Sequence, residues 1–225
     1  KEHDLKIVFT PLHGTTYELV PASLRNWGFT NIHTVPEQSI PDGDFPTVAS
    51  ANPEEPAAFK MALDLARKID ADLAMACDPD GDRIGIAVKN DAGEWTLLNG
   101  NQTNIIFTEY IIRRKKELNQ LKGGEYTVKT IVTTELIKNK AKKNHIICYD
   151  VYTGFKWIAD IIRKEGGEKF IGGGEESFGY MPGAFTRDKD GVSATSLMAE
   201  IAAWVKMQNK TLYSFLKEIY AKYGL

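Results

Sequence analysis

Short apolar runs alternate along the chain with segments whose apolar residues recur at helical spacing. In the first 98 residues the apolar runs predict strands, and the helical spacing is clearest at Phe59, Leu63, Ala66 and Ile69. The expected elements, in order, are strand 5–9, helix 17–27, strand 31–35, a long loop 36–56, a helix from Pro56, strand 73–77 and strand 84–88. This order of strands and helices is typical of a mostly parallel sheet covered by helices.

The same alternation begins again after Leu98-Asn99-Gly100, where we expect a domain boundary. The expected elements are helix 102–118, strand 127–132, helix 134–143, strand 145–149, helix 155–165, strand 170–171, helix 192–208 and helix 211–222. We therefore predict an α/β protein of two consecutive three-layer domains, 1–98 and 99–225, each with a mixed, mostly parallel sheet.

Composition narrows the class of protein. The chain has 225 residues, of which 43% are hydrophobic, which is enough for one or two well-packed domains. A net charge of −2 argues against nucleic-acid binding, and the sequence has no apolar run of membrane-spanning length. Its start has no signal-peptide core, and Cys77 and Cys148 fit free thiols in a cytoplasmic protein. Cysteine and histidine pairs at zinc-ligand spacing are missing.

The segment Cys77-Asp78-Pro79-Asp80-Gly81-Asp82-Arg83 holds the clearest chemical signal. Three aspartates alternate with small or rigid residues directly after a predicted strand, so their side chains can turn toward one point. Converging carboxylates repel one another unless a cation lies between them, and oxygen ligands favour Mg²⁺, Ca²⁺ or Mn²⁺.

A calcium EF-hand does not explain these aspartates. Counted from Asp78, an EF-hand needs glycine at position six and glutamate at position twelve, where this chain has Arg83 and Lys89. The flanking segments are also strand-like. Magnesium is favoured because it accepts few carboxylates and leaves places for phosphate oxygens. A solvated acidic turn between two strands is the alternative.

A second loop follows the predicted strand 170–171 and has the sequence Gly172-Gly173-Gly174-Glu175-Glu176-Ser177. A dinucleotide fingerprint would need a third glycine at Ser177, so that interpretation fails. Glycines permit close approach of a ligand, and carboxylates and hydroxyls suit the hydroxyls of a sugar. A turn with glutamates on the surface is the alternative.

Three further segments carry weaker signals. Thr153-Gly154-Phe155-Lys156 lies at a helix start and can bind an anion, or it is an ordinary helix start with an exposed lysine. The polar loop 187–191 has the same two interpretations. Ser50, before Asn52-Pro53, looks like a nucleophile but has no neighbouring base, so we interpret it as structural.

Together these segments resemble the α-D-phosphohexomutases, the phosphoglucomutase/phosphomannomutase family. The matching segments, in chain order, are Pro11-Leu12-His13-Gly14, Asn52-Pro53-Glu54-Glu55, Asp78-Pro79-Asp80-Gly81-Asp82-Arg83, Thr153-Gly154-Phe155-Lys156 and Gly174-Glu175-Glu176-Ser177. The resemblance covers the second and third of the family's four domains. It implies an Mg²⁺-dependent isomerase of carbohydrate metabolism that interconverts hexose 1-phosphate and hexose 6-phosphate.

The resemblance also implies a role for each loop. A phosphoserine, which makes the enzyme a phosphoprotein, exchanges phosphoryl groups with the sugar phosphate through a bisphosphorylated intermediate. Asp78, Asp80 and Asp82 would hold Mg²⁺, and Arg83 would stabilise the transferring group. Glu175 and Ser177 would bind sugar hydroxyls, and Lys156 would contact the substrate and assist proton transfer. Some relatives carry histidine where this chain has Tyr180.

The serine loop of the family's first domain and the phosphate loop of its last domain are not in this sequence. We therefore expect a piece of a larger enzyme that is inactive alone, with those two domains of the same polypeptide as its partners. A phosphopentomutase of the same family is an alternative, as is a non-catalytic module that binds sugar phosphate or Mg²⁺. A phosphatase with an aspartate nucleophile would need lysine and threonine motifs around the metal loop that are not found.

Overall fold

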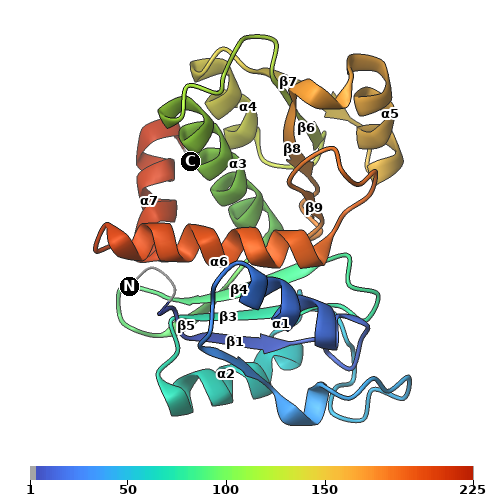
Figure 1. Cartoon of the computed structure of the whole chain (residues 1–225), viewed down its shortest axis with the longest axis vertical. Coiled ribbons are helices and arrows are strands. Elements are labelled where there is room, and N and C mark those ends of the chain that lie inside the picture. Colours follow the sequence, from blue (N-terminus) through green and yellow to red (C-terminus); the bar gives the residue numbers. More distant parts are fainter. Residues whose placement is uncertain (1–3, 225) are drawn as a thin grey trace. The chain divides into compact units, whose positions relative to one another are not determined.

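The structure is a computed structural model that describes residues 4–224, and it divides into two compact units (Figure 1). The first unit contains the chain up to Asn99 together with Gly191–Phe215. The second contains Gly100–Asp190 and the segment from Leu216 onward. Each unit has its own sheet, which confirms the predicted fold class.

The predicted domains follow one another along the chain, whereas each of the two units is made of two separate segments. Gly191–Phe215 packs within the first unit, because helix α6 (Gly191–Met207) is apolar on most of its surface and is buried against β3, β4 and α1. A helix that is hydrophobic nearly all round needs neighbours on several sides. The boundary between residues 98 and 99 stays a prediction.

The sheet of the first unit has the strand order β2-β1-β3-β4-β5. Its strands are β1 (Ile7–Thr10), β2 (Ile32–Thr34), β3 (Leu73–Cys77), β4 (Ile84–Lys89) and β5 (Trp95–Leu98). β1 is parallel to β2 and β3, whereas β4 is antiparallel to β3 and β5. The acidic segment therefore lies in a hairpin connection between β3 and β4.

Helices cover both faces of this sheet. Helix α2 (Pro56–Ile69) packs through Phe59 on Ala74 and Ala76 of β3. Cys77 points to the other face, where its Sγ lies 3.6 Å from Oγ1 of Thr195 in α6. Helix α1 (Thr16–Asn26) packs against α6, and the Ser23 and Ser196 hydroxyls are 2.7 Å apart. A short 3₁₀ helix spans Pro36–Gln38.

The sheet of the second unit has the strand order β7-β6-β8-β9. Its strands are β6 (Tyr126–Thr130), β7 (Ile147–Val151), β8 (Phe170–Gly174) and β9 (Tyr180–Met181). β6 is parallel to β7 and β8, and β9 is antiparallel to β8. Its other elements are α3 (Gly100–Glu117), α4 (Glu135–Lys143), α5 (Phe155–Glu165) and a 3₁₀ helix, Gly167–Lys169. The last helix, α7 (Leu212–Tyr223), crosses the division between the units.

Two cores form in this unit. Phe155, Ile158 and Ile162 of α5 pack on Tyr126 and Val128 of β6. Ile112 of α3 and Ala141 of α4 pack on Ile171 of β8. Among residues 4–224, none of the helices combines the length and the apolar character that crossing a bilayer requires.

The elements differ from the predicted ones mainly around glycines and short strands. β8 continues to Gly174, although its three glycines predicted a loop from residue 172. Pairing with β9 explains this, because Gly173 lies opposite Met181 and Gly174 opposite Tyr180. β7 lies two residues later than predicted, and β5 and β9 were not predicted.

Candidate functional site

The acidic loop, defined as Asp78–Arg83, brings the three predicted ligands together. One carboxylate oxygen from each of Asp78, Asp80 and Asp82 lies within 4.8 Å of the other two. In the part of the chain that the structure describes, no other group of His, Cys, Asp or Glu side chains meets this condition. Gly81 permits the turn, with a φ of +78°. This set of oxygen donors fits a hard divalent cation.

Asp78 is the buried member of the three, with 8% of its surface exposed. Burial raises the pKa of Asp78 to about 7, the backbone N–H of Arg83 opposes this, and the charges of Asp82 and Asp80 add to it. Asp78 Oδ1 accepts hydrogen bonds from the N–H groups of Asp82 and Arg83, at 3.1 and 2.9 Å. The main chain thus fixes Asp78 while its negative charge remains poorly compensated.

Arg83 lies beside the acidic loop and also reaches a residue from another segment. Its Nη1 is 3.2 Å from Oε1 of Glu54, and its Nε is 3.7 Å from Oδ2 of Asp78. Arg83 is partly exposed, so the guanidinium can turn toward an anionic ligand. The structure thereby brings the Asn52-Pro53-Glu54-Glu55 segment to the predicted metal site.

The segment before α1 supports the acidic loop through hydrogen bonds and close backbone packing at Pro79. Thr15 donates to the Pro79 carbonyl through its N–H at 2.8 Å and its hydroxyl at 3.1 Å. A Cβ on Gly14 would lie 2.2 Å from the Pro79 Cα, so only glycine allows this approach. His13 is buried, with Nδ1 3.0 Å from the Ile40 carbonyl and Nε2 2.8 Å from the Thr47 hydroxyl.

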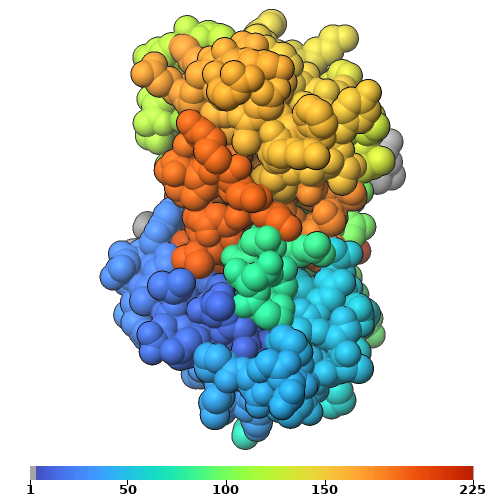
Figure 2. Space-filling view, turned by 90° about the vertical axis from the view of Figure 1, so that its right-hand side faces the viewer, coloured from blue at the N-terminus to red at the C-terminus, as the bar shows by residue number. Residues whose placement is uncertain are grey.

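A hollow adjoins the acidic loop on the surface of the first unit. It is lined by Phe45, Ala49, Ser50, Ala51, Asn52, Asp78, Pro79 and Arg83. Figure 2 shows the segment around residue 80 as a green patch next to blue atoms of the preceding segments. The Ser50 hydroxyl donates to Oε1 of Glu55 at 2.8 Å, which supports a structural role.

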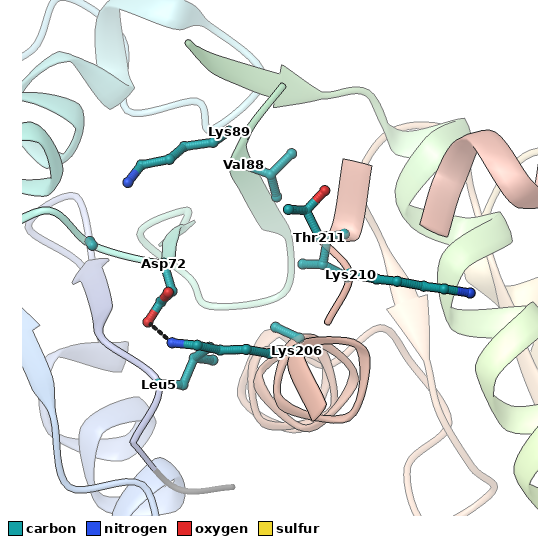
Figure 3. Close-up of a pocket in the computed structure, with 10 residues that line it drawn as sticks. Leu5, Asp72, Val88, Lys89, Lys206, Lys210 and Thr211 are labelled. Carbon is teal, nitrogen blue, oxygen red and sulfur yellow. Dashed lines mark hydrogen bonds and ion pairs between the residues drawn. The ribbon is translucent and has the colours of Figure 1, made fainter. Parts of the chain in front are cut away.

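Another cavity of about 220 Å³ in the first unit is lined in part by Lys89, Lys206 and Lys210 (Figure 3). Lys206 pairs with Asp72 at 2.7 Å, whereas Lys89 and Lys210 extend in opposite directions. Lys89 pairs with Asp70. Because the ammonium groups do not converge, this cavity has none of the geometry of an anion site.

The glycine loop, defined as Gly172–Tyr180, is the corresponding feature of the second unit. Glu175 is 5% exposed, and its Oε1 accepts a hydrogen bond from the N–H of Gly154. Its own N–H donates to the Gly179 carbonyl at 3.0 Å. The structure therefore brings the Thr153–Lys156 segment, at the start of α5, against the glycine loop.

The first turn of α3 holds the main chain of the glycine loop. The side-chain amide of Asn104 donates to the carbonyls of Glu175 and Gly100, both at 2.8 Å. A Cβ on Gly100 would lie 1.7 Å from the Glu176 carbonyl oxygen, and one on Gly174 would lie 2.0 Å from Asn104 Oδ1. Both glycines are therefore required for close packing here.

The remaining predicted residues lie as follows. Ser177 is half-buried in the glycine loop. Lys156 is exposed, and its Nζ lies 5.3 Å from the centre of the Trp157 ring. Glu176 does not face the same way as Glu175, because its Oε2 accepts from the hydroxyls of Thr130 and Thr133, each at 3.0 Å. Tyr180 is buried and stacked on Phe107, and burial raises its pKa.

Sequence reasoning missed Thr15 and Asn104 as supports of the site, and it named Glu54 only within a matching segment, without its contact to Arg83. Thr15, Glu54 and Asn104 make their contacts across more than 25 positions of sequence. Glycine at positions 14 and 100 was the one signal available, because each marks a place where two backbones meet.

The comparisons with known proteins agree with this architecture. The model for phosphoglucomutase/phosphomannomutase, alpha/beta/alpha domain II, matches residues 1–93, and the model for domain III matches residues 99–223. The phosphoglucomutase of Staphylococcus aureus (strain MRSA252) is 39% identical over 222 residues, which is 98% of this chain and 40% of that protein.

Two solved structures show the same fold at lower identity. A phosphoglucomutase/phosphomannomutase family protein from Burkholderia thailandensis has a TM-score of 0.73 and 18% identity over 96% of this chain and 43% of its own. The Aspergillus fumigatus N-acetylphosphoglucosamine mutase, in complex with GlcNAc-6P and magnesium, has a TM-score of 0.60 and 14% identity over 98% of this chain and 50% of its own.

Fold and site together define an α/β protein with a cluster of three converging carboxylates in one unit and a glycine-rich loop in the other. The chain belongs to the phosphoglucomutase/phosphomannomutase family and corresponds to its domains II and III. It spans about two fifths of the length of the Staphylococcus aureus phosphoglucomutase.

Proposed function

We propose that this chain supplies the magnesium-binding and sugar-binding parts of a phosphohexomutase that interconverts hexose 1-phosphate and hexose 6-phosphate. The convergence of Asp78, Asp80 and Asp82 within 4.8 Å carries the proposal. Two comparisons support it. The Aspergillus fumigatus mutase is in complex with magnesium, and the Staphylococcus aureus relative is a phosphoglucomutase that is 39% identical to this chain.

The three aspartates would hold the ion, and bound Mg²⁺ would act as a Lewis acid toward a phosphoryl oxygen. Arg83, whose guanidinium already lies at the acidic loop, would contribute positive charge to the transferring phosphoryl group. Asp78 would give up any proton it carries before binding the ion, because only the carboxylate is a ligand.

The glycine loop would bind the sugar. Glu175 accepts one N–H at present and has acceptor capacity left for a sugar hydroxyl, and Ser177 can donate or accept. Lys156 would contact a phosphate group and assist proton transfer. We propose that the phosphoserine and a second phosphate site come from the family's first and last domains in the same polypeptide, and that this chain alone does not turn over glucose 1-phosphate.

Steady-state kinetics of a polypeptide with all four domains test these roles. Glu175→Ala and Ser177→Ala should raise KM, because the hydroxyls they bind change little during transfer. Asp78→Ala should mainly lower kcat, because the charge it serves develops at the phosphoryl group. Equal losses of kcat with unchanged KM would contradict this division of roles. Turnover by the chain alone, in the presence of Mg²⁺ and a bisphosphate activator, would contradict the proposed need for the other domains.

A further inference from the structure

We propose that Glu176 is a positioning residue of the glycine loop, anchored by Thr130 and Thr133, and that it does not bind the sugar. The loop's role in sugar binding rests on the proposed function, whereas the anchor itself rests on contacts within the second unit. The residue types alone do not distinguish Glu175 from Glu176, although the family resemblance implies sugar binding for Glu175 only. In the structure, their carboxylates accept from different partners.

The two carboxylates separate just after β8, where the chain leaves the strand and bends over residues 176–178. Glu175 turns toward the start of α5 and accepts from Gly154. Glu176 turns toward the end of β6, where both threonine hydroxyls lie 3.0 Å from its Oε2 and 2.7 Å from each other. A carboxylate is the strongest acceptor among these oxygens, so the hydroxyl protons are directed to it.

The threonines themselves are rigidly held. Both are buried, at 0% and 2% exposure, and the N–H of Thr133 donates to the Thr130 carbonyl at 3.0 Å in the turn between β6 and α4. Thr134, which caps α4, is fixed by Asn101 Oδ1 at 2.9 Å. The anchor for Glu176 is therefore part of a strand end and a helix cap and does not depend on a mobile side chain.

A buried lysine fixes the same turn from the other side. Lys129 has no exposed surface, and its Nζ donates to the Thr133 and Thr130 carbonyls at 3.0 and 3.3 Å. Burial lowers the pKa of Lys129, but hydrogen bonds to Glu135 and Asp150, at 2.8 and 2.9 Å, outweigh burial and leave the pKa above its usual value. The charged ammonium thus keeps both carbonyls, and so both hydroxyls, in place.

Glu176 completes a three-point attachment of the glycine loop. Asn104 holds the main chain at Glu175, Gly154 holds the Glu175 side chain, and the threonine pair holds the next residue. Ser177 follows directly and has its place set by these attachments. Loss of the Glu176 anchor should therefore loosen residues 175–179 while β6 and the core of the unit keep their structure.

Amide hydrogen exchange of this chain tests the anchor without any requirement for catalysis. Glu176→Gln and the double variant Thr130→Val/Thr133→Val should each speed exchange of the Glu175 amide, which donates to Gly179, by about tenfold or more. Glu168→Gln, an exposed glutamate of the same unit, is the matched control and should leave exchange unchanged. The double variant Thr130→Ser/Thr133→Ser should keep the protection that the valine variant loses, because serine retains the hydroxyls.

A variant that combines Glu176→Gln with Thr130→Val/Thr133→Val gives the decisive result. If Glu176 acts through the threonines, all three substitutions together should speed exchange no more than Glu176→Gln alone. Additive effects, unchanged exchange at Glu175, or equal acceleration throughout the second unit would each overturn the proposal.

Kinetics in the four-domain polypeptide separate this proposal from the proposed function. Glu176→Gln should raise KM for glucose 1-phosphate while kcat changes less than about twofold, because a loosened loop weakens sugar binding equally in ground and transition states. If Glu176→Gln changes exchange but Glu175→Ala leaves KM unchanged, the anchor stands and the sugar-binding role of the loop fails. If Glu175→Ala raises KM and Glu176→Gln changes neither exchange nor KM, the anchor fails and the function stands.

Discussion

The acidic loop and the glycine loop both place carboxylates directly after a strand, yet their electrostatic states are opposite. In the acidic loop, three carboxylates crowd together, and Asp78 has a pKa raised to about 7. In the glycine loop, Glu175 and Glu176 are each met by protein donors, from Gly154 and from the threonine pair. In the acidic loop, the one guanidinium of Arg83 lies beside Asp78, Asp82 and Glu54, whereas each glutamate of the glycine loop accepts hydrogen bonds from protein donors.

This difference teaches that carboxylate count alone does not identify a cation site. What distinguishes the acidic loop is the convergence of three carboxylates beside Arg83, which is shared with Glu54. A divalent ion relieves that repulsion, whereas in the glycine loop an ion would have to displace existing hydrogen bonds. The following experiments test this contrast.

Asp80→Ala should have the largest effect on the acidic loop. The substitution removes one of three ligands, so we expect Mg²⁺ affinity to fall by about 100-fold or more, because even indirect support of a ligand is worth 10–100-fold. Asp80 is exposed, so the unit should stay folded. Isothermal titration with Mg²⁺ measures the affinity, with Asp64→Ala on α2 as the control. Unchanged affinity would remove the acidic loop from the candidate metal sites.

Gly14→Ala should disturb the acidic loop through its support. The new Cβ would meet the Pro79 backbone at 2.2 Å, so the free energy of unfolding should fall by about 1–3 kcal/mol. Gly43→Ala is the control, since nothing lies within 4 Å of a Cβ there. Urea denaturation monitored by tryptophan fluorescence compares the two. If the two variants are equally stable, the backbones at Gly14 and Pro79 can move apart at little cost, and the prediction is wrong.

The stability of the metal-free protein should depend on pH through Asp78 of the acidic loop. Asp78 has a folded-state pKa raised from 3.8 to about 7, so the folded protein binds more protons than the unfolded protein between these values. The free energy of unfolding of the metal-free protein should therefore fall as pH rises from about 4 to 7. Saturating Mg²⁺ should reduce this fall, because it favours the carboxylate.

Asp78→Asn is the matched variant for this measurement. Thermal unfolding at several pH values should show a smaller loss of stability from pH 4 to 7 in the variant than in the unmodified chain. A variant with the same loss would assign the pH dependence to other groups.

Ser50→Ala should have the smallest effect, although Ser50 lines the hollow beside the acidic loop. Its hydroxyl donates only to Glu55, so stability should change by no more than about 0.5 kcal/mol. Turnover in the four-domain polypeptide should stay within about twofold, because the proposed nucleophile is a serine elsewhere. Abolished turnover in a folded variant would make Ser50 a reacting residue.

The elements and the acidic loop could be predicted because their signals are local. Helix α5 was expected at 155–165 and is found at Phe155–Glu165, since its apolar period is regular. Asp78, Asp80 and Asp82 alternate within five residues, and chain geometry alone brings such neighbours together.

The supports of the site could not be predicted because they depend on tertiary contacts. Nothing in the sequence indicates that Glu176 turns to Thr130, 46 positions away, or that Asn104 reaches the Glu175 carbonyl, 71 positions away. The glycine run likewise predicted a loop, because glycine weakens a strand. In the structure, pairing with β9 keeps these glycines in β8, and the sequence does not indicate that pairing.

The placement of α6 in the first unit has a consequence for synthesis on the ribosome. The face of β3 and β4 that α6 covers is complete in sequence by residue 89, but the helix that buries it begins at Gly191. About a hundred residues must be translated in between, which at typical rates takes several seconds. During that interval α6 is not available to cover this apolar face, so we expect the nascent chain to be prone to aggregation until α6 emerges.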